Sequence, residues 1–247
     1  MKRLFTFGCS YTNWCWPTWA DYIGINFQEY YNLADSGCDN KNILFNVLQA
    51  DKTHKFTKDD TIIVMFTSFN RCSYFKNYEL YNVGDVVKAQ DNHPMINKYP
   101  YEAGIYDSWI SANSIKTIFD TKDLNYQFIQ AMPYDFMWKN HKVLNTRTDI
   151  KYSTLVKDYN ESLYVKISLD EWARKKYDFD SEQVVWQDNG MNDGHPTMKM
   201  HLDFVKAFFP QYYTEKATDF YDLNVKHFTD DSQGKQGKKF ELIKKQI

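Results

Sequence analysis

Short apolar runs alternate along the chain with segments whose apolar residues recur at helical spacing. Residues 2–7, 27–33 and 126–132 each predict a strand. Thr61–Phe66 is a continuous apolar run that follows a polar Lys-Asp-Asp turn. A run of this kind is typical of a central parallel strand that is covered on both faces. The chain is therefore expected to build a sheet around residues 61–66.

Apolar residues at helical spacing predict three helices, over residues 16–24, 40–52 and 106–119. Asp39 or Asn40 can cap the second helix, because short polar side chains satisfy the free N–H groups of a first turn. Strands and helices alternate from the first strand to the fourth. This order predicts an α/β fold, a doubly wound sandwich with a mostly parallel sheet between two layers of helices.

Two stretches depart from this alternation. From Arg71 to about Tyr101 the pattern is irregular, with Gly, Pro and many Asn and Tyr residues, which predicts a long loop or lid. Residues 134–182 contain helix-like pieces such as 162–176, whose packing the pattern does not specify.

The C-terminal part begins with a polar turn over residues 188–197, which opens a further predicted helix. Beyond Pro210 the chain loses its sheet-like pattern, and residues 233–239 have the composition of a polar linker. We therefore expect one domain over residues 1–209, with a lid inserted around 71–101, and a C-terminal extension over 210–247.

Composition narrows the possible functions. No apolar run approaches the ~20 residues that span a bilayer, and the basic N-terminus reaches Gly8 before a full signal sequence develops. We expect a cytoplasmic protein without a membrane partner. A net charge of −2 gives no basic face for nucleic acid, which is not expected as a partner. An aromatic fraction of 18% suits sugar stacking, although most of these rings are expected in the core.

The four cysteines are spaced too irregularly for a disulfide scaffold or a zinc site. They are Cys9, Cys15, Cys38 and Cys72. We expect reduced thiols, no metal and no cofactor. Cys9 could be imagined as a nucleophile, but neighbours in extended structure point opposite ways, so it is expected to pack inward if Ser10 faces a pocket.

The first strand ends in Gly8, and Ser10 follows just past its carboxyl end. Ligands of open α/β sheets bind at this edge, so the hydroxyl of Ser10 is a candidate nucleophile. The alternative is that Ser10 only caps the next helix, which is the better interpretation for an isolated Gly-x-Ser.

Three more motifs follow in a fixed order, and together they favour Ser10 as a nucleophile over Ser10 as a helix cap. Gly8-Cys9-Ser10-Tyr11-Thr12 is followed by Asn32-Leu33-Ala34-Asp35-Ser36-Gly37, by Ser68-Phe69-Asn70, and by Asp193-Gly194-His195-Pro196. Together the four blocks resemble the SGNH, or GDSL-type, hydrolase family. The resemblance covers roughly residues 1–209 and implies a flavodoxin-like three-layer α/β/α fold.

The resemblance also implies a role for each block. Ser10 would be the nucleophile, His195 its general base, and Asp193 the carboxylate that orients His195. The oxyanion hole would consist of the backbone N–H groups of Ser10 and Gly37 and the side-chain amide of Asn70. These are the groups that acyl transfer needs.

The sequence departs from the family pattern at three places. Cys9 stands where an aspartate is usual, Asn70 follows Ser-Phe instead of Gly-Thr, and Asp193 lies two residues before His195 where three is more frequent. Either Asp193 reaches the ring from a tight turn, or Asn192 or a backbone carbonyl orients it. His201 resembles a structural histidine of the family.

Other residues near the motifs allow further interpretations. His93 also stands in an Asp-x-His-Pro sequence, but it lies in the expected lid. Arg71 and Tyr11 are candidate substrate-binding residues because they adjoin Asn70 and Ser10. For Arg71, a structural salt bridge is an equal alternative.

The expected function is that of a serine esterase acting on a small ester, such as an O-acetyl group on a carbohydrate, through an acyl-enzyme. An acyltransferase with the same site is an alternative, since only the exclusion of water separates transfer from hydrolysis. A catalytically inactive domain that binds glycan or protein is another.

Overall fold

The computed structural model describes residues 2–69, 71–76, 79–85, 101–132, 161–177, 185–186, 192–193 and 195–230. Its centre is a sheet of four parallel strands in the order β2-β1-β3-β6. These strands are β1 (Arg3–Phe7), β2 (Glu29–Asn32), β3 (Thr61–Phe66) and β6 (Asn125–Gln130). The four predicted strands are thus confirmed, and their order is that of a doubly wound sheet.

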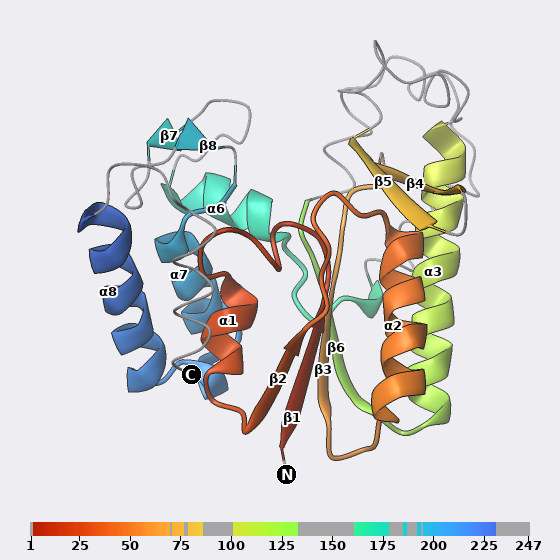
Figure 1. Cartoon of the computed structure of the whole chain (residues 1–247), viewed down its shortest axis with the longest axis horizontal. Coiled ribbons are helices and arrows are strands. Elements are labelled where there is room, and N and C mark those ends of the chain that lie inside the picture. The colour runs from red at the N-terminus through yellow and green to blue at the C-terminus, as the bar shows by residue number, and fades with distance from the viewer. Residues whose placement is uncertain are drawn as a thin grey trace.

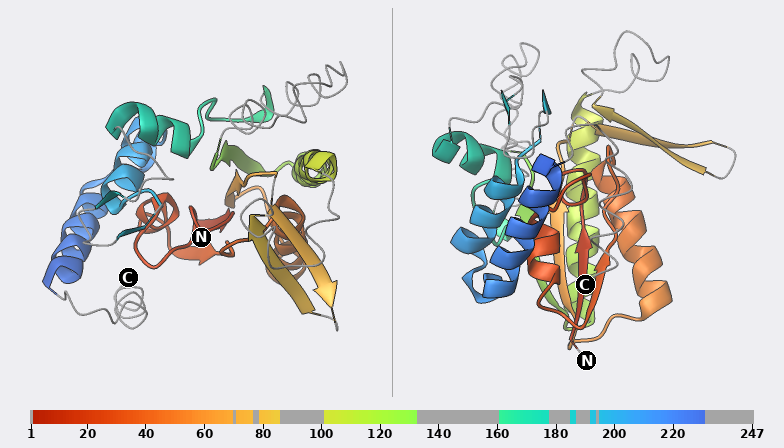
Figure 2. Two further views of the ribbon diagram at one scale, coloured as in Figure 1. Left: turned by 90° about the horizontal axis from the view of Figure 1, so that it is seen from above. Right: turned by 60° about the vertical axis from the view of Figure 1, so that its left-hand side comes forward.

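Helices cover both faces of this sheet (Figure 1). On one side lie α2 (Asn40–His54) and α3 (Tyr101–Thr121). On the other lie α1 (Trp19–Gly24), α6 (Leu169–Tyr177), α7 (Met198–Phe208) and α8 (Glu215–Asp230). The three layers, seen from above in Figure 2, confirm the expected α/β/α sandwich. No helix of the described ranges is long and apolar enough to cross a membrane.

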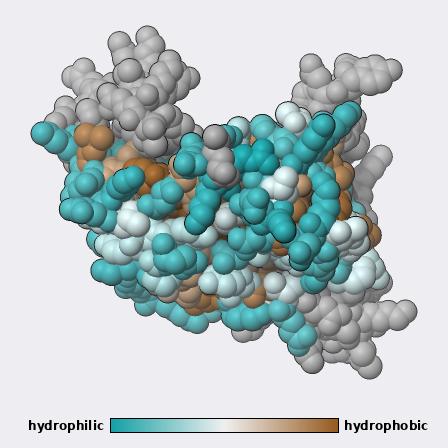
Figure 3. All heavy atoms as spheres, turned by 90° about the horizontal axis from the view of Figure 1, so that it is seen from below, coloured by the Kyte–Doolittle hydropathy of each residue, from teal (hydrophilic) through white to brown (hydrophobic). Residues whose placement is uncertain are grey.

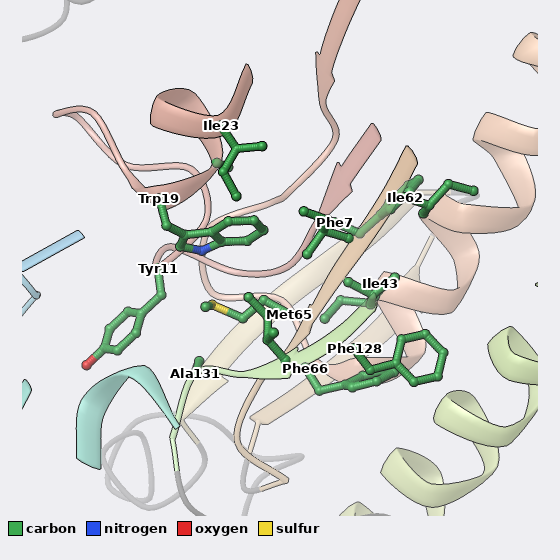
Figure 4. Close-up of a cluster of buried hydrophobic side chains, with 14 of the residues drawn as sticks. Phe7, Tyr11, Trp19, Ile23, Ile43, Ile62, Met65, Phe66, Phe128 and Ala131 are labelled. Carbon is green, nitrogen blue, oxygen red and sulfur yellow. The ribbon is translucent and has the colours of Figure 1, made fainter. Parts of the chain in front are cut away.

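The core lies on both faces of β3, whose six residues are all buried. Figure 4 shows how it is divided: Ile43 and Phe128 lie toward α2 and α3, whereas Trp19 and Ile23 lie on α1. Burial on both faces explains why β3 reads as a continuous apolar run. On the underside of the molecule, hydrophobic side chains form small separate patches among hydrophilic ones (Figure 3).

Residues 71–85 differ from their prediction as part of a loop. They form an antiparallel hairpin of β4 (Arg71–Lys76) and β5 (Glu79–Asp85), which extends away from the main sheet (Figure 2). Tyr, Phe and Val favour strands here, but the polar residues between them hide the pattern. The backbone N–H of Ser73 donates to the Asp39 carboxylate at 2.7 Å, which fixes the hairpin to the start of α2. Residues 86–100 of the predicted lid lie outside the described residues.

The helix-like segment 162–176 also differs in part, because α6 begins only at Leu169. Before it, the backbone N–H of Tyr164 donates to the Phe128 carbonyl at 2.7 Å, so the chain runs beside β6. The N–H of Asp170 donates to the Ala131 carbonyl at 3.0 Å. These bonds hold the start of α6 at the carboxyl edge of the sheet. Two further short strands, β7 (Val185–Trp186) and β8 (Asn192–Asp193), form an antiparallel pair.

Residues 209–230 pack against the core. A short 3-10 helix, η3 (Pro210–Tyr212), leads into α8, where Ala217 and Phe220 are buried in the main hydrophobic cluster. The ring of Phe220 meets Tyr22 of α1 edge-on, with 5.9 Å between the centroids. The linker predicted over residues 233–239 lies outside the described residues.

Candidate functional site

The turn after β1 is tight and leaves no space for a side chain at Gly8. A Cβ at Gly8 would lie 2.2 Å from Oγ1 of Thr12. The N–H groups of Thr12 and Asn13 both donate to the carbonyl of Cys9, at 2.8 and 3.1 Å. Ser10, between them, keeps 3% of its surface exposed. Cys9 is fully buried in the core, as predicted.

The loop after β2 is bound to this turn. The N–H of Asp35 donates to the Gly8 carbonyl at 3.0 Å, and the Asn13 side chain donates to the Ala34 carbonyl at 3.1 Å. Gly37 has a φ of 79°, which few residues other than glycine adopt without strain. The first two motif blocks, which carry Ser10 and Gly37, therefore lie together at the carboxyl edge.

Asn40, at the start of α2, binds both backbone groups of Thr67, in the segment after β3. Its side-chain oxygen accepts from the N–H of Thr67 at 2.9 Å, and its amide donates to the Thr67 carbonyl at 3.1 Å. The same amide donates to the Ser108 hydroxyl of α3 at 2.8 Å. Asn40 thus fixes the third motif block at its start. Asn70, the predicted oxyanion donor, lies outside the described residues.

His195 lies against the turn that carries Ser10, in an aromatic box of Tyr11, Trp14 and Trp16. The Trp14 ring stacks on the imidazole, with 3.8 Å between centroids and 19° between planes. Tyr11 and Trp16 meet it edge-on, at 5.5 and 6.5 Å. The Trp16 indole N–H also donates to the Pro196 carbonyl at 3.0 Å. Two motif blocks that are far apart in sequence therefore meet in space.

Tyr11, one wall of this box, is buried, and its hydroxyl points toward α6 (Figure 4). The hydroxyl lies 3.5 Å from the Asp170 carboxylate, which also accepts from Nε of Arg174 at 2.7 Å. Burial is the main cause that raises the pKa of Tyr11 well above its usual value, and the negative charge of Asp170 adds to it. The positive charges of Arg71 and Arg174 lower this pKa. Arg71 is the first residue of β4, and its positive charge acts to lower the pKa of both Tyr11 and Cys38.

His201, on α7, is 1% exposed. Burial, together with the charge of His195, lowers the pKa of His201 to about 3, so its imidazole is neutral throughout the physiological range. Within the described part of the chain, Nδ1 of His201 has no hydrogen-bond partner. The expected structural character of this residue fits its burial.

Asp193 lies on β8, opposite Val185 of β7, two residues before His195. Its side chain is outside what the structure describes, as is Gly194. The structure therefore brings together Ser10, Tyr11, Gly37 and His195, and the positive charge of Arg71 acts on Tyr11. The roles of Asp193 and Asn70 stay predictions.

Cys38 directly follows Gly37, and its thiol is fully buried. Burial raises the pKa of Cys38 well above its usual value, and its Sγ donates to the Gly8 carbonyl at 3.1 Å. Among the residues that the structure describes, no group of three His, Cys, Asp or Glu side chains could hold a metal ion.

The sequence prediction missed Trp14, Trp16 and Asp170 as parts of the site. The two tryptophans follow Ser10 closely, and a pair of large rings beside a candidate nucleophile could have indicated a wall of the site. Asp170 gives no such signal, because its contact with Tyr11 joins residues 159 positions apart.

Comparisons with known proteins give only distant similarity. No protein-family model and no curated protein match the chain. A mutant of Axe2, an acetyl-xylooligosaccharide esterase from Geobacillus stearothermophilus, is 18% identical, with 86% of this chain and 94% of that chain covered and a TM-score of 0.49. Axe2 itself, an acetylxylan esterase, is 15% identical over the same shares, with a TM-score of 0.42.

A member of the lipolytic protein G-D-S-L family from Veillonella parvula is 13% identical, with 85% of this chain and 99% of that chain covered and a TM-score of 0.46. Its family is the one that the four motif blocks resemble. At these TM-scores the similarity assigns neither a substrate nor a catalytic residue to this chain.

Proposed function

We propose that this chain is a serine esterase of the SGNH type, which hydrolyses a small ester such as an O-acetyl group on a carbohydrate. The observation that carries the proposal is the position of His195. Its imidazole stacks on Trp14 and packs on Tyr11, which directly follows Ser10 in the turn after β1. A general base must lie near its nucleophile, and these contacts hold His195 at that turn.

In this proposal Ser10 Oγ attacks the ester carbonyl while His195 takes the hydroxyl proton. The tetrahedral intermediate collapses when His195 gives that proton to the leaving alcohol. Water then attacks the acyl-enzyme by the same route, releasing the acid and restoring Ser10. Asp193 would orient His195 and stabilise its protonated form.

The negative charge that develops on the carbonyl oxygen needs donors fixed in advance. We assign this role to the N–H groups of Ser10 and Gly37 and to the Asn70 amide. The bond from Asp35 to Gly8 and the two bonds between Asn40 and Thr67 support this assignment, because they fix the segments next to Gly37 and before Asn70.

The two proposed substrate-binding residues differ in their surroundings. Tyr11 is 2% exposed and supports the ring of His195, so its effect on substrate would be exerted through that ring. Arg71 lies at the start of β4, where its charge could attract an anionic part of a substrate.

The deciding experiment is intact-mass spectrometry after incubation with a fluorophosphonate, on the wild type and on Ser10→Ala, His195→Ala and Ser36→Ala. Ser36 is an exposed serine in the neighbouring loop and serves as the matched control. A single adduct that is lost in the first two variants and kept in the third is expected. Absence of an adduct on folded wild-type protein would contradict the proposal and favour an inactive binding domain.

Product analysis then separates hydrolysis from transfer. With an acetyl donor and a sugar acceptor present together, the esterase releases acetate and leaves the acceptor unmodified. Acetylated acceptor as the main product would instead identify an acyltransferase with the same Ser10 chemistry.

A further inference from the structure

A groove of about 350 Å³ lies between α2 and the segment that follows β2. Its volume falls within the range of ligand pockets. The lining residues are Leu33, Ala34, Asp35, Asn46, Gln49, Ala50, Thr53 and His54. The segment 33–35 ends two residues before Gly37, so the groove begins beside the proposed oxyanion loop and continues along α2.

The helix side of the groove is one continuous face of α2. Asn46, Gln49, Ala50 and Thr53 recur at spacings of three and four residues, which places them on the same side of a helix. The Asn46 amide donates to the Leu33 carbonyl at 3.3 Å and so joins the two walls. Ala34 and Ala50, both buried, contribute the smallest side chains of the lining.

The chemistry of the lining indicates a neutral, hydroxyl-rich ligand. It offers one carboxylate, two amides, one hydroxyl and one imidazole, which together supply both donors and acceptors. None of the eight lining residues is Lys or Arg, and Asp35 carries a negative charge, so the lining does not favour an anion. Leu33, Ala34 and Ala50 add an apolar floor for the C–H face of a sugar ring.

We propose that this groove binds the carbohydrate part of the substrate, and this rests on the proposed esterase function. The ester group would lie at Ser10, while neighbouring sugar units lie along α2. Binding energy from such a distant part of a substrate can be used to position the reacting group.

The test measures binding of oligosaccharides that carry no O-acetyl group and therefore contain no ester. Xylotriose, cellotriose, maltotriose and N,N′,N″-triacetylchitotriose are titrated into Ser10→Ala protein and followed by isothermal calorimetry and by amide shifts in NMR spectra. Gln49→Trp fills the groove from an exposed position of α2, and Lys52→Trp places the same ring on an exposed position outside the lining.

At least one oligosaccharide is expected to bind with shifts at residues 33–35 and along α2. Gln49→Trp should weaken that binding by about tenfold or more, the effect of losing one or two hydrogen bonds, while Lys52→Trp should leave it within about twofold. Binding that survives in Gln49→Trp, or no binding by any of the four sugars, overturns the groove proposal.

The outcomes separate the two proposals. Labelling of Ser10 by the fluorophosphonate without sugar binding removes the groove and leaves the esterase. Sugar binding at the groove without labelling keeps the binding site and removes the esterase.

Discussion

Trp14 lies flat on the imidazole of His195, and this contact is a testable part of the site at the scale of a single residue. The stack restricts the tilt of the ring, which a general base needs in order to keep its geometry. We expect Trp14→Ala to lower kcat/KM for p-nitrophenyl acetate by about tenfold to a hundredfold, since small misplacements of a catalytic group cost this much. Trp14→Phe, which keeps a flat ring, should restore most of the rate.

Thermal unfolding of the same variants provides the control. If Trp14→Ala and Trp14→Phe lose equal activity, the flat ring is not what positions His195. If they lose activity only in proportion to lost folded protein, Trp14 has a structural role alone.

His201 gives a prediction for the pH dependence of stability. Its pKa is about 3 in the folded protein, because of burial and the charge of His195, and about 6.5 in an unfolded chain. As the pH falls below 6.5, the unfolded state binds a proton that the folded state does not, so the free energy of unfolding decreases. One such group contributes on the order of 1 kcal/mol per pH unit, or about 2 kcal/mol between pH 6.5 and 4.5.

We expect His201→Leu to remove this slope from urea unfolding curves measured between pH 7 and 4.5. His54→Gln, at a partly exposed histidine of α2, is the matched control and should keep it. An unchanged slope in His201→Leu would show that this imidazole is protonated in the folded protein.

Asn40 connects three elements, since its side chain bonds both backbone groups of Thr67 and the hydroxyl of Ser108. We expect Asn40→Ala to lower the free energy of unfolding by about 3 kcal/mol, because it removes three buried hydrogen bonds. It should also lower kcat/KM, because the segment before Asn70 loses its support. Asn113→Ala, which removes one exposed bond within α3, should change either quantity little. Full activity in Asn40→Ala would separate this clamp from the proposed oxyanion hole.

Elements with strong local patterns could be predicted from the sequence, and elements made by distant contacts could not. β3 is apolar throughout, and α2 carries its cap at Asp39, which accepts from the Asn42 N–H. By contrast, the hairpin at 71–85 has only weak strand signals. Residues 163–168 follow β6 through a bond from Tyr164 to Phe128, which no local pattern indicates.

The same division holds in the site. Ser10, Gly37 and His195 stand in short motifs that can be read directly from the sequence. Their surroundings depend on tertiary packing: Trp16 bonds Pro196 across 180 positions. Such a contact becomes visible only when the chain is folded.

At the scale of the whole molecule, the role of the chain beyond residue 209 decides where the domain ends. Asn26, after α1, donates to the Tyr212 carbonyl at 2.9 Å and accepts from the Thr214 hydroxyl at 2.7 Å. Ala217 is fully buried and Phe220 is 6% exposed, within the same cluster as β1 and β3. Because α8 buries apolar surface of the main core, its removal exposes that surface to water.

We therefore expect a chain of residues 1–209 to be less stable than the whole chain. The point variant Phe220→Ala should cost about 3 kcal/mol or more, in the range for deleting a buried phenyl ring. Circular dichroism during urea unfolding measures all three proteins, and Leu223→Ala, at a position of α8 that is 40% exposed, is the control. If residues 1–209 unfold at the same urea concentration as the whole chain, α8 is an extension that the domain does not need. If residues 1–209 unfold at a lower urea concentration than the whole chain, and Phe220→Ala unfolds at a concentration between the two, then α8 is part of the domain. The domain boundary then lies beyond residue 209.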